Sequence, residues 1–312
     1  MDRWTEYEFF VRVVEMGSLT KAAASLGISN PAASRHLASL EKRLGARLVE
    51  RSTRSLFVTE IGHEFVSQCK FALEHMQEAV DAVTATNSNP TGLLRVTASL
   101  SLMLRHIAPL LSDFSRRCPN VRVELVAANR YYDIIDNNID VAIRTRELEP
   151  DTSLVVRPLA TTRRLLAAAP RYIEQYGIPE DPRALSEHRL LGYTYHSPGE
   201  LTFCRADESL TIKTVPLFAA NDGQILRSAA IDGLGILAQP MYVIHDDLVA
   251  GRLIPLLLDW ELPRMSINIV YPRRKLVPPK TRAFIDFLIQ HFAAHDYERR
   301  WDALLETFAK AT

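Results

Sequence analysis

A cluster of basic residues between positions 35 and 54 is the part of this sequence whose chemistry is easiest to name. This stretch holds six basic and two acidic residues, so its net charge is +4, whereas the whole 312-residue chain is neutral. The basic residues are Arg35, Lys42, Arg43, Arg47, Arg51 and Arg54. Cations this close together are expected where a surface contacts phosphate groups. A surface that only faces solvent can carry the same charge. Whether these residues contact phosphate therefore depends on the helices and strands that position them.

Hydrophobic periodicity places the cluster on and after the third of three short helices. Apolar spacing predicts a first helix over residues 4–15, which ends at Gly17. Ser18 can cap a second, alanine-rich helix over residues 21–26. Ser29 can cap the third helix, with Pro31 in the first turn, where no backbone N–H is needed.

The third helix has two different faces. The buried stripe is predicted to hold Ala33, Leu37, Leu40 and Leu44, and the outer face Pro31, Ser34, Arg35, Ala38 and Lys42. Small side chains allow a helix backbone to approach the major groove of DNA, where Arg35 can contact guanine and Ser34 a base edge or phosphate. Taken alone, the helix fits an ordinary amphipathic surface helix equally well.

Two short strands are predicted directly after this helix, over residues 48–50 and 56–58. They would form a hairpin with Arg51 and Arg54 at its tip. Such a wing can place arginines along phosphates or in the minor groove. A wing that follows a helix-turn-helix therefore favours DNA binding over a plain surface helix.

The first sixty residues resemble the LysR-type transcriptional regulators. The matching residues are Gly17, Ser18, Leu19, Thr20, Ala22, Ala23, Leu26, Gly27, Ile28, Ser29, Pro31, Ala32, Ser34, Arg35, Leu40, Glu41, Leu44, Gly45, Leu48, Arg51, Thr53, Arg54, Thr59 and Gly62. The sequence departs from the family at Asn30, Ala33 and Val49, where Gln, Val and Phe are more common. Because Asn30 can still bond a base or phosphate, this departure bears on the operator sequence and not on DNA binding.

The resemblance implies that Ser34 and Arg35 contact bases and that the wing arginine reaches the minor groove. The candidate DNA-binding residues are Thr20, Lys21, Ser29, Asn30, Pro31, Ser34, Arg35, Lys42, Arg51 and Arg54.

A long helix is expected from Thr59 to about Thr86. Its apolar residues Phe65, Cys69, Ala72, Met76, Ala79 and Val83 recur at alternating intervals of four and three, as in a coiled-coil seam. A second copy of the helix would bury this stripe and form a dimer, which is also how the family pairs. Packing against the chain's own domains is the alternative. Residues 87–92 then read as a hinge.

Strands and helices alternate over the remaining two hundred residues. Strands are predicted at 93–98, 121–126, 141–143, 235–238 and 267–271, and helices at 102–117, 132–138, 222–231, 241–249 and 284–292. This order implies open α/β sheets with helices on both faces. In such sheets, ligands bind beyond the carboxyl ends of the strands, near helix N-termini.

That rule selects six candidate effector-binding residues, namely Ser99, Ser101, Asn129, Arg144, Asn221 and Asp222. Serines at a helix N-terminus with an arginine nearby would suit a carboxylate. The alternatives are that the serines, Asn221 and Asp222 simply cap helices and that Arg144 is an exposed charge.

The C-terminal part also resembles the LysR effector domain, which is built like a periplasmic binding protein. The resemblance implies an α/β protein with a winged helix-turn-helix (1–59), a linker and dimerisation helix (60–90) and an effector-binding domain (91–312). The effector would lie between subdomain I (about 91–161 and 265–292) and subdomain II (about 162–264). Residues 293–312 extend past the family's usual end, and Trp301, Leu304, Leu305 and Phe308 predict a short amphipathic helix packed on the same domain.

Several other classes of protein lack support in the sequence. It has none of the Gly-x-Ser-x-Gly, His-Glu-x-x-His, P-loop or dinucleotide-binding motifs, so we expect neither an enzyme nor a cofactor. The nine histidines lack metal-ligand spacing, and the three cysteines are expected to be reduced thiols.

The sequence also lacks a signal peptide and a membrane-spanning run, which argues against an exported solute-binding protein and for a cytoplasmic one. A purely architectural DNA binder would not need the large C-terminal domain. The expected partners are double-stranded DNA, a small-molecule effector with carboxylates among the candidates, and copies of the chain in a homodimer or homotetramer. RNA polymerase is a further candidate partner.

Overall fold

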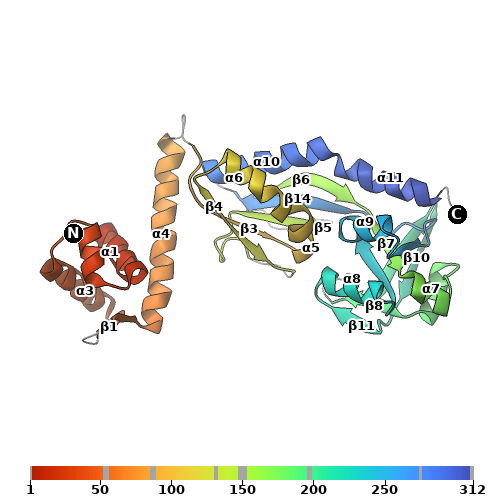
Figure 1. Ribbon diagram of the computed structural model, residues 1–312, viewed down its shortest axis with the longest axis horizontal. Coiled ribbons are helices and arrows are strands. Elements are labelled where there is room, and N and C mark those ends of the chain that lie inside the picture. The colour runs from red at the N-terminus through yellow and green to blue at the C-terminus, as the bar shows by residue number, and fades with distance from the viewer. Residues whose placement is uncertain are drawn as a thin grey trace. The chain divides into compact units, whose positions relative to one another are not determined.

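A computed structural model describes residues 2–51, 56–84, 89–129, 133–146, 153–194, 199–273 and 276–309. The chain divides into two compact units near residue 88, and each is described by itself (Figure 1).

The first unit consists of helices, a two-stranded hairpin and a long final helix. Its elements are α1 (Arg3–Met16), α2 (Leu19–Ser25), α3 (Asn30–Leu44), β1 (Val49–Arg51), β2 (Leu56–Val58) and α4 (Glu60–Thr84). The predicted caps form, because the Ser18 and Ser29 side chains accept hydrogen bonds from the backbone N–H groups of Lys21 and Ala32. Gly45 ends α3 at a φ of +67°, a backbone conformation that is unfavourable for residues other than glycine.

The core of this unit fixes which side of α3 faces outward. Ala33, Leu37 and Leu40 are at most 1% exposed and pack with Phe9 and Phe10 of α1. The prediction that Leu44 completes this stripe is wrong, because Leu44 lies in the last turn of α3 and is 38% exposed.

Helix α4 packs its first half against the chain's own first helix. The Phe65 ring lies 5.7 Å from the rings of both Tyr7 and Phe10, and Cys69 is only 4% exposed. Farther along the helix, Met76 is 46% and Val80 51% exposed. The alternative interpretation therefore describes the first part of the seam, whereas Met76 is exposed. The side chains of Ala79 and Val83 lie outside the described residues.

The second unit contains two five-stranded sheets and a two-stranded ribbon. The first sheet has the order β4-β3-β5-β14-β6, the second the order β11-β8-β12-β7-β13, and β9 pairs with β10. The strands are β3 (Gly92–Ala98), β4 (Val121–Ala127), β5 (Val141–Arg146), β6 (Leu154–Thr162), β7 (Arg164–Ala168), β8 (Leu190–Tyr193), β9 (Glu200–Arg205), β10 (Glu208–Lys213), β11 (Phe218–Ala220), β12 (Ile236–Pro240), β13 (Ile254–Leu256) and β14 (Met265–Pro272). Below, subdomain I contains the first sheet and subdomain II the second.

The helices of this unit are shorter and more broken than periodicity predicted. They are α5 (Leu100–Leu102), η1 (Met103–Ile107), η2 (Ala108–Leu110), α6 (Leu111–Arg117), α7 (Pro170–Tyr176), η3 (Pro182–Glu187), α8 (Gly223–Ile231), α9 (Met241–Val249), α10 (Pro279–His295) and α11 (Tyr297–Ala309). The chain passes between the sheets twice, at Arg163 between β6 and β7 and between β13 and β14.

Two helix predictions for this unit are wrong. The continuous helix over 102–117 is a π-helical turn and a 3₁₀ turn before α6, because Pro109 lacks an N–H and its ring clashes with the preceding turn. No helix forms over residues 133–138, the described part of the predicted helix 132–138. There the Asp133 carboxylate accepts hydrogen bonds from the N–H groups of Ile135 and Asp136, which holds a turn instead.

Helix α11 connects both subdomains. It covers the predicted C-terminal helix and packs against β6 of subdomain I and α9 of subdomain II. Trp301 and Leu305 are each 4% exposed within the main core, and Glu298 accepts a hydrogen bond from the Thr161 N–H. Because α11 contacts both subdomains, it helps to set the relative position of the two sheets.

Gly62 generates a prediction about the stability of the first unit. A Cβ atom at this position would lie 2.2 Å from the Leu48 carbonyl oxygen and 2.8 Å from Val58 Cγ1. Because backbone cannot easily shift, we expect Gly62→Ala to lower the free energy of unfolding of this unit by about 1–3 kcal/mol.

Urea titration with hydrogen exchange resolved to residues 2–51 would measure this change. Ser67→Ala, which adds an alanine at an exposed position of the same helix, is the control and should have little effect. Equal stability of the two variants would show that α4 does not pack this closely on the hairpin.

Candidate functional site

The outer face of α3 gathers most of the predicted DNA-binding residues. Ser29 caps the helix and Asn30 and Pro31 form its first turn, while Arg35 and Lys42 follow along an exposed face. Ser34 is half-buried on that helix, and Thr20 and Lys21 are exposed on α2. The structure therefore places seven of the ten candidates on two adjacent helices, and an eighth, Ser29, at the N-cap of α3.

The other two candidates, Arg51 and Arg54, follow α3 in the sequence. Arg51 is the last residue of β1, where it pairs with Leu56 of β2. Arg54 lies outside the described residues.

Two acidic residues hold α3 and the hairpin in place, and neither was predicted to have this role. Glu41 Oε1 accepts hydrogen bonds from the N–H groups of Leu48 and Val49, at 2.8 and 3.1 Å, and so ties β1 to α3. Buried Glu6 pairs with Arg43 at 2.6 Å. Arg43 is therefore a structural member of the basic cluster, whereas Arg35 and Lys42 keep their charges on the exposed face.

A cavity of about 890 Å³ lies between the two sheets of the second unit. The ends of β3 and β5 border it on the side of subdomain I, and β7, β8 and β12 border it on the side of subdomain II. Residues from both subdomains line it, so its shape depends on their relative position.

Four of the six predicted effector-binding residues line this cavity, namely Ser99, Ser101, Asn129 and Arg144. Asn221 and Asp222 are not among the lining residues. Asp222 is 5% exposed and caps α8, accepting hydrogen bonds from the N–H groups of Gln224 at 2.6 Å and Ile225 at 3.4 Å.

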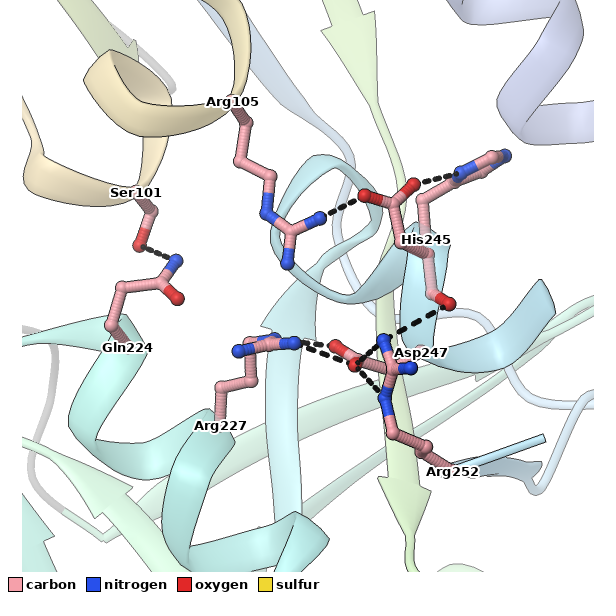
Figure 2. Close-up of polar contacts among 8 residues, drawn as sticks. Ser101, Arg105, Gln224, Arg227, His245, Asp247 and Arg252 are labelled. Atoms are coloured by element: carbon pink, nitrogen blue, oxygen red, sulfur yellow. Dashed lines mark hydrogen bonds and ion pairs between the residues drawn. The ribbon is translucent and has the colours of Figure 1, made fainter. Parts of the chain in front are cut away.

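Hydrogen bonds and an ion pair join the subdomains along one side of the cavity, and we call this set the polar seam. It comprises Ser101–Gln224, Asn129–Asp222, Thr145–Tyr242 and Arg105–Asp246. Figure 2 shows Ser101 and Arg105 reaching from subdomain I toward α8 and α9. The approach is close, because a Cβ at Gly223 would lie 3.1 Å from Ser101 Oγ.

Next to the polar seam, subdomain II contains a cluster of ion pairs around one buried carboxylate. Asp247 is fully buried and binds the guanidinium groups of both Arg227 and Arg252 (Figure 2). This cluster joins α8 to α9, so the two helices that face subdomain I are held together as one surface.

Tyr242 lies where the seam meets the cavity. Its hydroxyl is 3.3 Å from Thr145 Oγ1 and also bonds to Ser99. Burial raises the pKa of Tyr242, so the hydroxyl keeps its proton near neutral pH and can both donate and accept.

Among the described residues, the charged side chains that line the cavity are Arg144, Arg164 and Glu200. Apolar side chains such as Ile143, Leu166 and Ile236 form much of the remaining wall. Two arginines against one carboxylate, beside apolar surface, suit an anion with an apolar body. Arg164 was not among the predicted residues, and its only signal in the sequence is its position just after the predicted crossing near Ala160.

Within the described residues, no group of three or more acidic, histidine or cysteine side chains could hold a metal ion. None of the described helices is both long and apolar enough to pass through a bilayer. The three cysteines are free thiols, and burial raises the pKa of Cys69 to about 11, which keeps that thiol protonated.

A winged helix-turn-helix joined to a unit with a cavity between two sheets defines a class of ligand-responsive DNA-binding regulators. Residues 4–63 match the family of bacterial regulatory helix-turn-helix proteins of the LysR type, and residues 87–293 match the LysR substrate binding domain. The chain therefore belongs to the LysR-type transcriptional regulators, which bind DNA and carry a C-terminal effector-binding domain.

Individual relatives are similar in sequence to this chain over nearly its whole length. The transcriptional regulator CrgA of Neisseria meningitidis is 35% identical over 288 residues, 91% of this chain and 95% of that protein. The activator AaeR of Escherichia coli is 31% identical over 94% of both chains. Among solved structures, CrgA gives a TM-score of 0.61 at 34% identity, covering 92% of this chain and 98% of that one. The Vibrio cholerae virulence activator AphB gives 0.60 at 28% identity, covering 93% and 99%.

Asp222 generates a prediction about the polar seam. Its carboxylate binds the Asn129 amide, and Asn129 Oδ1 in turn accepts a hydrogen bond from the Leu100 N–H at 3.2 Å. Asp222→Ala removes both a helix cap and the bond that orients Asn129. We expect it to lower the free energy of unfolding by about 1–2 kcal/mol and to speed hydrogen exchange at the Leu100 amide.

Asp181→Ala is the matched control, because Asp181 caps η3 through Arg183 and Ala184 without a bond to subdomain I. It should destabilise the protein without affecting Leu100. Equal exchange at Leu100 in the parent and in Asp222→Ala would mean that Asp222 does not support the seam.

Proposed function

We propose that this regulator binds an operator through the outer face of α3 and the hairpin, and that an anionic effector binds in the cavity between the subdomains. The observation that carries the second part is that both sheets contribute walls to this cavity, while the seam beside it consists of polar contacts. A ligand can shift such an arrangement only if it binds one relative position of the subdomains more tightly than another.

On the DNA side, each candidate has a role set by its place. Arg35 contacts guanine in the major groove, Ser34 contacts a base edge or phosphate, and the remaining α2 and α3 candidates contact the backbone. Arg51 and Arg54 lie along phosphates or in the minor groove. The exposure of Arg35 and Lys42 on a helix whose opposite face is fully buried supports this assignment.

Arg35→Ala should lower the discrimination between the operator and scrambled DNA by about 1–3 kcal/mol, because the bidentate contact with a base is lost. Fluorescence anisotropy at several salt concentrations measures the two DNA affinities, with the DNA upstream of the protein's own gene as the operator. Arg12→Ala is a matched control, since Arg12 is an exposed arginine of α1 that pairs with Glu8. A discrimination that is unchanged in Arg35→Ala would refute the assigned role.

The effector is an anion that bonds Arg144 and Arg164 and lays an apolar body against the walls of the cavity. Ser99, Ser101 and Asn129 bond its polar groups, and Asn221 and Asp222 act indirectly by positioning α8. Small carboxylates are the first class to screen, because planar carboxylates match the guanidinium fork.

A thermal-shift screen of small carboxylates tests this site. We expect a ligand at one hundred times its dissociation constant to stabilise the parent by about 2.7 kcal/mol, and expect Ser99→Ala or Arg144→Ala to remove most of that gain while DNA affinity changes little. Arg122→Ala, an exposed arginine of β4, is the control. A response that survives in both Ser99→Ala and Arg144→Ala would place the ligand elsewhere.

The proposed regulator is a homodimer or a dimer of dimers, paired through the outer part of α4. The exposure of Met76, a residue of the predicted seam, supports this pairing, since an apolar stripe on a helix is normally covered. Binding of the effector changes the spacing of the DNA-binding units and hence promoter output, with RNA polymerase as a further candidate partner. Relatives include a named repressor and a named activator, so family membership alone does not determine the sign of regulation.

A further inference from the structure

A second, smaller cavity of about 140 Å³ lies where η1, α9 and α11 meet. None of its lining residues is a candidate DNA-binding residue. It shares one lining residue, Tyr242, with the larger cavity assigned to the effector. Its lining residues are Arg105, His106, Tyr242, His245, Asp246, Tyr297, Arg300 and Trp301.

His106 is the unusual residue of this cavity. It is 7% exposed, and its Nδ1 atom has no hydrogen-bond partner among the described residues. The rings of Tyr297 and Trp301 approach the imidazole nearly edge-on, at 4.9 and 5.6 Å. Burial lowers the pKa of His106 to about 4, so near neutral pH the ring is uncharged and keeps both a donor and an acceptor. A buried polar atom without a partner is costly, and a bound molecule can supply the partner.

The charges around the cavity favour an anion. Asp246 is already bound by Arg105 and by His245, whose Nδ1 lies 3.1 Å from its carboxylate (Figure 2). Arg300 lies over the Tyr297 ring, 5.9 Å from its centre, and makes no ion pair within the described part of the chain. One guanidinium therefore remains available at the rim of the cavity.

We propose that this cavity is a second ligand site, which takes a small carboxylate. The carboxylate bonds Arg300 and the His106 ring, and its apolar part lies against Tyr297 and Trp301. The size fits, because a cavity of about 150 Å³ in another protein holds benzene. A cation is disfavoured, since the one carboxylate at the site is already paired.

Tyr242 connects this site to the larger cavity, because it lines both. Its ring lies 6.1 Å from the His106 ring, whereas its hydroxyl bonds Thr145 and Ser99. A ligand in the small cavity thus touches the side chain that contributes to the polar seam.

Calorimetric titration of the full-length chain with butyrate tests the proposal, since butyrate has as many non-hydrogen atoms as benzene. Arg300→Gln should weaken binding about tenfold or more through loss of a charge-assisted hydrogen bond. Arg299→Gln, which removes the neighbouring exposed charge without touching the cavity, should bind like the parent. Equal binding by both variants, or none by the parent, would overturn the proposal.

Histidine-ring ¹⁵N spectra locate the bound probe independently of affinity. Butyrate should shift the His106 resonances in a saturable way in the parent and equally in Arg144→Ala, whose substitution lies in the larger cavity. Loss of the response in Arg144→Ala would assign the probe to the larger cavity and reject a second site. Arg144→Ala alters only the larger cavity. The effector site and the second site can therefore be tested separately with this variant.

Discussion

The contact between the two subdomains is the constraint on which the second unit depends. One continuous hydrophobic core contains residues of both sheets, among them Val96 and Leu237, and beside the cavity the subdomains are also joined by hydrogen bonds and an ion pair. Single polar contacts of this kind contribute roughly 0.5–1.5 kcal/mol each. Beside the cavity, the relative position of the subdomains is therefore held by several weak bonds, in addition to the apolar core that they share. The first unit is the opposite case, because a tightly packed core fixes the face of α3.

The sequence predicted the first unit almost element by element, for local reasons. Ser18, Ser29, Gly17 and Gly45 act through their own turns, so caps and helix ends can be read from neighbouring residues. The seam of α4 was harder. Its period of 3.5 is a true signal of a buried stripe, but periodicity does not say what buries it, and Phe65 and Cys69 pack on the chain's own α1.

In the second unit, the rule that ligands bind beyond strand ends located Ser99, Ser101, Asn129 and Arg144 at the cavity wall. Arg164 and Tyr242 escaped prediction because their positions follow from how the chain crosses between sheets, which no local pattern encodes. The broken helix after Leu102 and the turn after Asp133 had a readable cause in Pro109 and in a side chain that competes for backbone N–H groups. The strands between residues 154 and 213 were not predicted, although Leu201 and Phe203 of β9 and Leu210 and Ile212 of β10 do alternate with residues of the opposite face.

The most direct test of the account is the distance between the subdomains, measured by double electron–electron resonance. Spin labels at Arg122 and Gln175, both exposed, would be placed in a Cys204→Ser background and diluted with unlabelled chain. If the polar seam helps to hold the subdomains in the position that the structure shows, Gln224→Ala should broaden the distribution or shift it to longer distances. Identical distributions with and without the Gln224 side chain would contradict a cavity controlled by its polar seam.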